Sequence, residues 1–159
     1  MDTLTSLGIN QTVTTGVYCD LTVNKTIHND SFGTLKSAIG CAVDGDTIYI
    51  DSAIAGMTID VATDSIVVDK NIIIRADPSD NIKVSSSGST AALVIASGKT
   101  VSIIGLDLED LSTTSGVIKN YGTLTIKDLD VVAKIGSVSI SNENGANLHV
   151  EGDCNLQEN

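Results

Sequence analysis

Aromatic, basic and proline residues are scarce in this chain. Its 159 residues include one Phe, three Tyr, no Trp and one Pro, and nine Lys and Arg residues stand against twenty Asp and Glu. The net charge of −11 makes nucleic acid and anionic membrane surfaces poor partners. Carbohydrate-binding clefts commonly present aromatic platforms, so the shortage of aromatic residues limits glycan binding and argues against a carbohydrate-active enzyme.

Long hydrophobic runs are also missing. No apolar stretch approaches the roughly 18 residues that a membrane-spanning helix needs, so we expect no membrane insertion. The first ten residues have neither a basic n-region nor an apolar h-region, and they do not resemble a signal peptide. A hydrophobic content of 42% with a single Pro excludes a disordered tail, and the length suits one domain.

Strand-like apolar segments recur about every two dozen residues. The clearest are Thr47–Ile50, Asn71–Ile74, Thr100–Ile103, Thr123–Ile126 and Asn147–Val150. A repeat of this length built from strands is typical of a solenoid, in which each repeat covers the apolar face of its neighbour. Two further short apolar segments follow in each repeat, separated by turn-forming residues. Three strands per turn predict an all-β fold, a parallel β-helix of four to five turns over residues 47–159.

Aligning the repeats predicts which outward residues are neighbours. Equal positions on successive turns lie about 4.8 Å apart. When the first apolar residues of the repeats are aligned, Asp51 falls beside Arg75 and Lys127 falls beside Glu151. Both pairs are oppositely charged, which supports the alignment, although an exposed pair of this kind adds only about 0.2–1 kcal/mol.

The residues ahead of the first repeat predict an N-terminal cap. Segment 31–43 carries apolar side chains at helical spacing, namely Phe32, Leu35, Ile39 and Ala42. Asp30 or Ser31 is placed to cap its first turn. An amphipathic helix here would cover the open end of the coil. We therefore divide the chain into an N-terminal extension (1–18), a cap containing a strand and the helix (19–46), and the β-helix (47–159).

The junction between this helix and the first strand resembles a known group. The run Gly33-Thr34-Leu35-Lys36, with Ala38-Ile39 and then Gly45-Asp46-Thr47-Ile48, is similar to the opening signature of right-handed parallel β-helix proteins of the bacterial cell surface. These belong to the pectin-lyase-like superfamily and include large adhesins of Bacteroidetes. The resemblance covers about residues 20–156. It implies an exported, surface-exposed and mostly non-catalytic module.

The three cysteines have different predicted environments. Cys41 points away from the apolar face of the predicted helix, and Cys19 precedes a short strand that could cross that outer side. A Cys19–Cys41 disulfide closing the cap is one hypothesis, and it would place the chain in an oxidising compartment. The alternative is two unpaired thiols. Cys154 occupies an inward position and is predicted to be a small buried apolar residue.

Catalytic candidates are few. A hydrolase of this superfamily would need two carboxylates facing one cleft, and a lyase would need a basic residue with calcium held by clustered acids. Arg75 is the only arginine, and its expected neighbours do not form an acid cluster. His149 and His28 have no acid predicted beside them. We therefore predict no catalytic residue in this chain.

One acidic column leaves two alternatives open. Lys83, Asp107, Asp130 and Asn155 are expected to stack outward on the second strands of successive turns. Two adjacent like charges are unfavourable unless they are hydrated or bridged by a cation. The commoner case is a hydrated acidic face, and the alternative is calcium bound by Asp107, Asp130 and a backbone carbonyl. No other cofactor is expected.

The fifth repeat stops after two strands, which leaves unpaired strand edges. We expect the chain to be the N-terminal part of a longer, extracellular or cell-surface protein, and the open edge would also permit an end-to-end dimer. The predicted function is a non-catalytic structural or adhesive segment of a secreted bacterial surface protein that contacts a glycan or a surface protein. The alternative is a fragment of a β-helix polysaccharide lyase or glycoside hydrolase whose active turns lie outside this chain.

Overall fold

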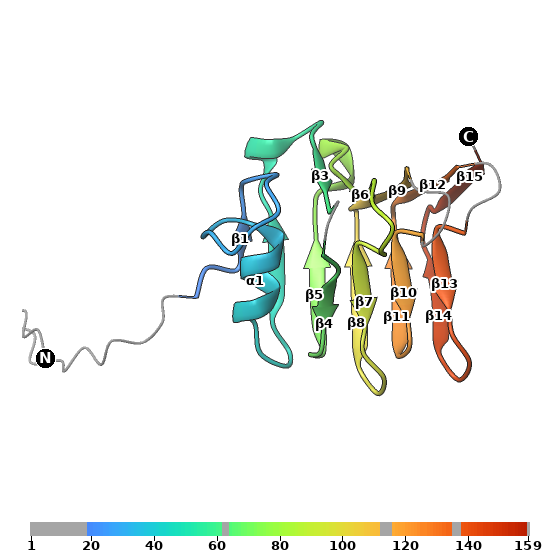
Figure 1. Ribbon diagram of the computed structural model, residues 1–159. Coiled ribbons are helices and arrows are strands. Elements are labelled where there is room, and N and C mark those ends of the chain that lie inside the picture. Colours follow the sequence, from blue (N-terminus) through green and yellow to red (C-terminus); the bar gives the residue numbers. More distant parts are fainter. Residues whose placement is uncertain (1–18, 62–63, 112–115, 135–137, 159) are drawn as a thin grey trace, which may run out of the picture.

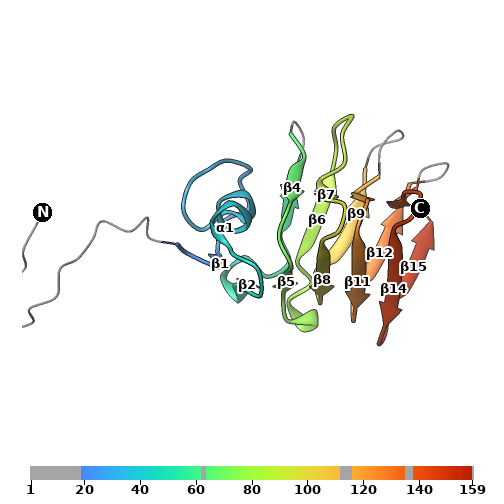
Figure 2. The same cartoon turned by 90° about the horizontal axis from the view of Figure 1, so that it is seen from below.

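The chain winds into a parallel β-solenoid of about five turns (Figures 1 and 2). The computed structural model describes residues 19–61, 64–111, 116–134 and 138–158, so the predicted N-terminal extension (1–18) lies outside the described residues. Every strand pairing is parallel and joins strands of successive turns, or β1 to the first turn. The predicted β-helix with three strands per turn is confirmed.

The strands form three sheets, each running along the solenoid axis. Sheet A has the order β1-β2-β5-β8-β11-β14, sheet B the order β3-β6-β9-β12-β15, and sheet C the order β4-β7-β10-β13. The first two turns contain β2 (Thr47–Ile50), β3 (Thr58–Asp60), β4 (Ile66–Val68), β5 (Ile72–Arg75), β6 (Lys83–Ser86) and β7 (Leu93–Ile95). The later turns contain β8 (Thr100–Ile104), β9 (Asp107–Asp110), β10 (Ile118–Asn120), β11 (Thr123–Lys127), β12 (Asp130–Ala133), β13 (Ile140–Asn142), β14 (Asn147–Glu151) and β15 (Asn155–Glu158).

Apolar side chains fill the interior in columns parallel to the axis. In sheet A, Ile48, Ile74, Ile103 and Ile126 pair in register and are at most 1% exposed. Alternation along each strand puts one side chain in two inward, which is why the sequence pattern locates these residues correctly. Burying a side chain of this size contributes about 1.5–3 kcal/mol. The core therefore runs without interruption from the first turn to the fourth.

The fifth turn lies at one end of the solenoid, and no further turn of the described residues is stacked on it. Val150 pairs with Ile126 and is 51% exposed, and Leu148 pairs with the buried Leu124 and is 37% exposed. In sheet B, Leu156 is also exposed. These side chains point inward by strand alternation, so their exposure comes from the open end of the coil.

The opposite end is covered by β1 (Thr22–Val23) and helix α1 (Leu35–Cys41), at the left of Figure 1. Leu35, Ala38 and Ile39 of α1 are buried in the common core, which confirms the capping helix. The helix is shorter than the predicted segment 31–43. Among the described residues, no helix has the length and apolar character that crossing a membrane requires.

The predicted start of the helix is wrong. The N-cap is Thr34, whose hydroxyl oxygen accepts a hydrogen bond from the Ser37 N–H, in place of Asp30 or Ser31. The Thr34 hydroxyl also donates to the carbonyls of Asn29 and Ser31, so it fixes the preceding loop as well as the helix. Phe32 lies outside the helix and is 56% exposed. Because both starts offer a capping residue, only the path of the loop distinguishes them.

The predicted pairing of Asp51 with Arg75 is also wrong. Arg75 pairs with Tyr49, two residues earlier on β2, and on the far side with Ile104. A slip of two residues keeps every side chain on its own face, so the alternating pattern cannot detect it. The pairing of Lys127 with Glu151 in β11 and β14 is confirmed.

Candidate functional site

A pocket lies at the corner where sheet A passes into sheet B. Its volume is about 310 Å³, and its lining comes from four successive turns, namely Tyr49, Ile50, Arg75, Ala76, Asp77, Pro78, Asp80, Ile104 and Asp128. The corners of the first two turns are long and include the short 3-10 helices η2 (Ser52–Ile54) and η3 (Pro78–Asp80). The corners of the third and fourth turns contain only two residues between their strands. The pocket therefore lies where long corners adjoin short ones.

The short corners depend on a left-handed backbone conformation. Gly105 has φ +65°, and a Cβ there would lie 2.5 Å from the Ala76 carbonyl oxygen and 3.0 Å from Pro78. Its equivalent on the next turn is Asp128, with φ +52°, and on the fifth turn Gly152, with φ +65°. Asp is among the few residues other than Gly that tolerate this region. At this position an Asp also gains a contact that a Gly could not make, because its carboxylate accepts a hydrogen bond of 3.1 Å from the Asp153 N–H.

Arg75 is the cation of this pocket. It is exposed on sheet A between Tyr49 and Ile104, and no ion pair within the described part of the chain involves it. The pKa of Asp77 is lowered, first by hydrogen bonds from the Ser79 N–H and hydroxyl and then by the positive charge of Arg75. Asp77 therefore stays ionised and fixes the start of η3.

The lining combines groups that suit a small polyhydroxylated ligand. Tyr49, 56% exposed, offers an aromatic face, while Pro78 and Ile104 offer apolar surface. The Arg75 guanidinium supplies hydrogen-bond donors, and the carboxylates of Asp80 and Asp128 supply acceptors. An aromatic face combined with hydrogen-bond donors and acceptors is compatible with contact to a sugar ring.

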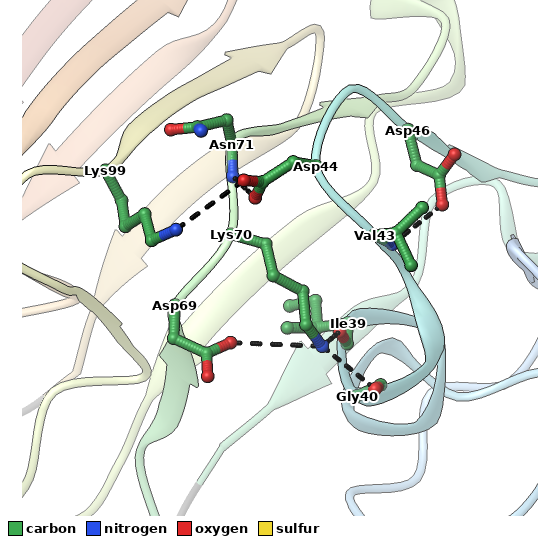
Figure 3. Close-up of polar contacts among 9 residues, drawn as sticks. All are labelled: Ile39, Gly40, Val43, Asp44, Asp46, Asp69, Lys70, Asn71 and Lys99. Carbon is green, nitrogen blue, oxygen red and sulfur yellow. Dashed lines mark hydrogen bonds and ion pairs between the residues drawn. The ribbon is translucent and has the colours of Figure 1, made fainter.

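A second polar cluster joins the cap to the coil (Figure 3). Lys70, at the corner before β5, donates hydrogen bonds from Nζ to the carbonyl oxygens of Ile39 (3.1 Å) and Gly40 (2.9 Å). These carbonyls lie in the last turn of α1, where the chain has no helical donors left and where a cation is favourable. Lys70 also lies 3.8 Å from the Asp69 carboxylate.

Asp44 continues this cluster along the axis. Its carboxylate accepts a hydrogen bond of 2.8 Å from the Asn71 N–H and lies 3.7 Å from Lys99 Nζ, as Figure 3 shows. The Asn71 N–H bond is the main cause that lowers the pKa of Asp44, and Lys99 adds to it. The Asn71 side-chain oxygen in turn accepts from the Thr100 N–H at 2.8 Å. Side chains thus link the cap to the second and third turns.

The acidic column of sheet B is assembled as the sequence predicts. Lys83 pairs with Asp107, and the Asp130 N–H donates to the Asp107 carboxylate at 2.8 Å. Burial raises the pKa of Asp107, and the neighbouring charge of Asp130 acts in the same direction. Lys83 forms an ion pair of 3.6 Å with Glu109. Among the described residues, no group of three or more His, Cys, Asp or Glu side chains is arranged to hold a metal ion.

Two of the three cysteines close the cap. Cys19 and Cys41 are joined by a disulfide, with Cα atoms 5.5 Å apart, and the bond ties the segment before β1 to the last residue of α1. Cys154 is unpaired and half-buried, and its thiol faces the Glu151 carbonyl at 3.2 Å.

The sequence did not single out Tyr49, Asp80 or Asp128 as residues that line one pocket with Arg75. The available signal was the contrast in corner length, together with the alignment of Asp128 with Gly105 and Gly152. Of the other candidates, His149 pairs with Thr125 at the open end, and His28 lies in the cap loop. Neither residue lines the Arg75 pocket.

No family model, no curated protein and no solved structure matches this chain. The resemblance to β-helix proteins of the pectin-lyase-like superfamily therefore rests on the motif residues, and the parallel β-solenoid rests on the structure.

Proposed function

We propose that this chain is a non-catalytic structural and adhesive β-helix segment of a secreted bacterial surface protein of the pectin-lyase-like type. The observation that carries the structural role is the uninterrupted core column from Ile48 to Ile126. A solenoid packed in this way transmits force and position along its axis through backbone pairing in three sheets. The cap contacts of Lys70 and Asp44 support the same role, because they resist fraying at the N-terminal end.

The Cys19–Cys41 disulfide supports the extracellular location. Disulfides form and persist in oxidising compartments and are rare in reducing ones. Mass analysis of the chain purified without reductant and alkylated either directly or after reduction tests this point. Recovery of the unreacted bond supports export, whereas complete alkylation before reduction would count against it.

The adhesive role is assigned to the Arg75 pocket. Its aromatic face, its cation and its carboxylates suit weak contact with one sugar ring of a surface glycan. The alternative of a lyase or hydrolase fragment predicts cleavage, since its chemistry would act on the polymer. Retention on the polymer without cleavage would therefore support the adhesive role, and cleavage would support the enzyme fragment.

The first experiment is a polysaccharide panel. The purified chain is incubated with neutral and acidic polysaccharides, with and without calcium, and new reducing or unsaturated ends and retention on each polymer are measured. We expect retention without new ends, and loss of retention in Arg75→Ala but not in Lys134→Ala, which lies away from this pocket. Cleavage that persists after repurification would overturn the non-catalytic assignment. Calcium-dependent retention that is lost in Asp107→Asn would instead assign binding to the acidic column.

A second copy of the chain is the proposed partner at the open end. Leu148, Val150 and Leu156 expose apolar surface there, and β13, β14 and β15 are the terminal strands of their sheets. Unpaired edges of this kind favour strand pairing with another chain. Sedimentation velocity at several concentrations tests the association. A concentration-dependent dimer that Val150→Lys abolishes supports it, and a monomer at all concentrations would exclude it.

A further inference from the structure

The turn between β13 and β14 contains an Asn-Gly sequence, Asn144-Gly145. The Ala146 N–H donates to the Glu143 carbonyl oxygen at 2.9 Å, which closes a four-residue turn with Asn144 and Gly145 at its centre. Gly145 has φ +84°, and both central residues are exposed. Asn-Gly is a favoured pair in tight turns because both residues tolerate positive φ. The same pair also places a backbone nitrogen next to a side-chain amide with which it can react.

Both reacting groups of this pair are free. The Asn144 side chain forms no hydrogen bond with the described residues, and neither does the Gly145 N–H. Because Gly145 has no side chain, nothing hinders the approach of its backbone nitrogen to the Asn144 side-chain carbon. A Cβ at Gly145 would meet no atom within 4 Å, so the surroundings leave the turn room to move.

Asp44-Gly45 provides an internal comparison. It could form the same five-membered ring, and it is also exposed. Its nucleophile is occupied, however, because the Gly45 N–H donates to the Asn71 carbonyl oxygen at 2.7 Å. Its electrophile is occupied as well, because the Asp44 carboxylate accepts from the Asn71 N–H and lies near Lys99. The lowered pKa of Asp44 keeps the carboxylate in the ionised form, which is the less reactive one.

We propose that Asn144 is a site of spontaneous deamidation in the folded chain. Asp44 is protected from the equivalent reaction by the contacts that Asp44 and Gly45 make with Asn71 and Lys99. The Gly145 nitrogen attacks Cγ of Asn144, the bond from Cγ to Nδ2 breaks, and ammonia leaves with the proton from the Gly145 amide. Water then opens the resulting succinimide at either carbonyl. The products are aspartate or isoaspartate at position 144, and the net change is one water consumed and one ammonia released.

The isoaspartate product has a structural consequence at this corner. It carries one extra methylene in the backbone between residues 144 and 145, so the span closed by the Glu143–Ala146 hydrogen bond becomes longer. Asn142 Nδ2 donates to the Ala146 carbonyl at 3.0 Å, and the Asn147 N–H donates to the Gly122 carbonyl at 2.9 Å. These bonds position the start of β14, and we expect them to weaken.

The test is an ageing experiment on the folded chain. Samples are held at neutral and mildly alkaline pH in heavy-oxygen water, separated by charge and mapped by peptide mass spectrometry. We expect one acidic species, with one more negative charge than the starting −11, carrying heavy oxygen at position 144 and forming faster at higher pH. The same ageing in urea should also convert Asp44 to isoaspartate, since unfolding removes its protecting bonds.

Two variants sharpen the result. Asn144→Gln keeps a neutral amide but disfavours the ring, so the acidic species should disappear. Asn144→Asp adds the charge without the methylene, so increased hydrogen exchange at Ala146 in the aged chain, and not in this variant, identifies the isoaspartate backbone as the cause. An acidic species that persists in Asn144→Gln, or isomerisation of Asp44 at an equal rate in the folded chain, would overturn the proposal.

Discussion

Removal of the Cys19–Cys41 disulfide should destabilise the cap by an amount that its loop length sets. The two cysteines are separated by 22 residues. Loop-closure entropy for a loop of this size corresponds to about 3 kcal/mol at 25 °C. With a urea dependence of about 1–3 kcal/mol per molar, the unfolding midpoint of Cys19→Ser/Cys41→Ser should fall by roughly 1–3 M if the chain unfolds as one unit.

The effect should be strongest near the cap, because a solenoid turn contacts only its neighbours. The Tyr49 N–H donates to the Leu21 carbonyl, and the Asp51 N–H donates to the Val23 carbonyl. Hydrogen exchange should therefore increase at Tyr49 and Asp51 in the double variant, while amides of β8 and β11 change less.

Urea unfolding with and without reductant, read by circular dichroism and by hydrogen exchange, measures both effects. Cys154→Ser is the matched control, since Cys154 is unpaired, and it should shift neither the midpoint nor its response to reductant. An unchanged midpoint in the double variant, or equal loss of protection in β11 and at Tyr49, would refute the reasoning.

Three further changes test other parts of the structure. Gly105→Ala should lower the free energy of unfolding in urea by about 1–3 kcal/mol more than Gly98→Ala does. Both positions have positive φ, but only at Gly105 would a Cβ strike neighbouring atoms. Equal losses of stability would show that backbone conformation alone matters. Asn120→Ala should destabilise by about 1–3 kcal/mol, because this buried side chain accepts from the Gly122 N–H and donates to two oxygens at the corner between β13 and β14. A loss of stability smaller than that caused by an exposed Asn→Ala change would contradict this. Asp44→Ala should lower stability at neutral pH. The pKa of Asp44 is lower in the folded state, so its contribution is full above the ordinary Asp pKa of 3.8 and is lost as pH falls through the lower folded pKa. Unfolding curves of both proteins should therefore converge at low pH, and a constant gap across pH would exclude an electrostatic origin.

The core residues could be predicted because each of them obeys a local rule. Each of Ile48, Ile74, Ile103 and Ile126 has another buried apolar residue two positions away on its strand, and the pleat turns residues two apart toward the same face. The adjacency of Asp107 and Asp130 followed from the short and equal corners of the third and fourth turns.

The Arg75 pocket could not be predicted because it depends on a two-residue choice of register. Pairing Arg75 with Asp51 or with Tyr49 leaves the same side chains buried, so the two registers look equivalent in the sequence. The choice is made at the preceding corner, where the Gly45 N–H donates to the Asn71 carbonyl and the Ile73 N–H donates to the Asp46 carbonyl. These bonds join residues far apart in the chain, and no local pattern encodes them.

The sequence by itself determined the repeat, the inward face of each strand and the existence of a helical cap, since these depend on periodicity within a few residues. The tertiary structure decided the register of the first two turns, the choice of Thr34 as the N-cap of α1 and the set of side chains that surrounds Arg75. It also decided that the Asn71 backbone bonds to both Asp44 and Gly45, whereas the Asn144 side chain has no hydrogen bond within the described part of the chain. Those features are set by hydrogen bonds and steric contacts between turns, whose partners are specified only once the coil has closed on itself.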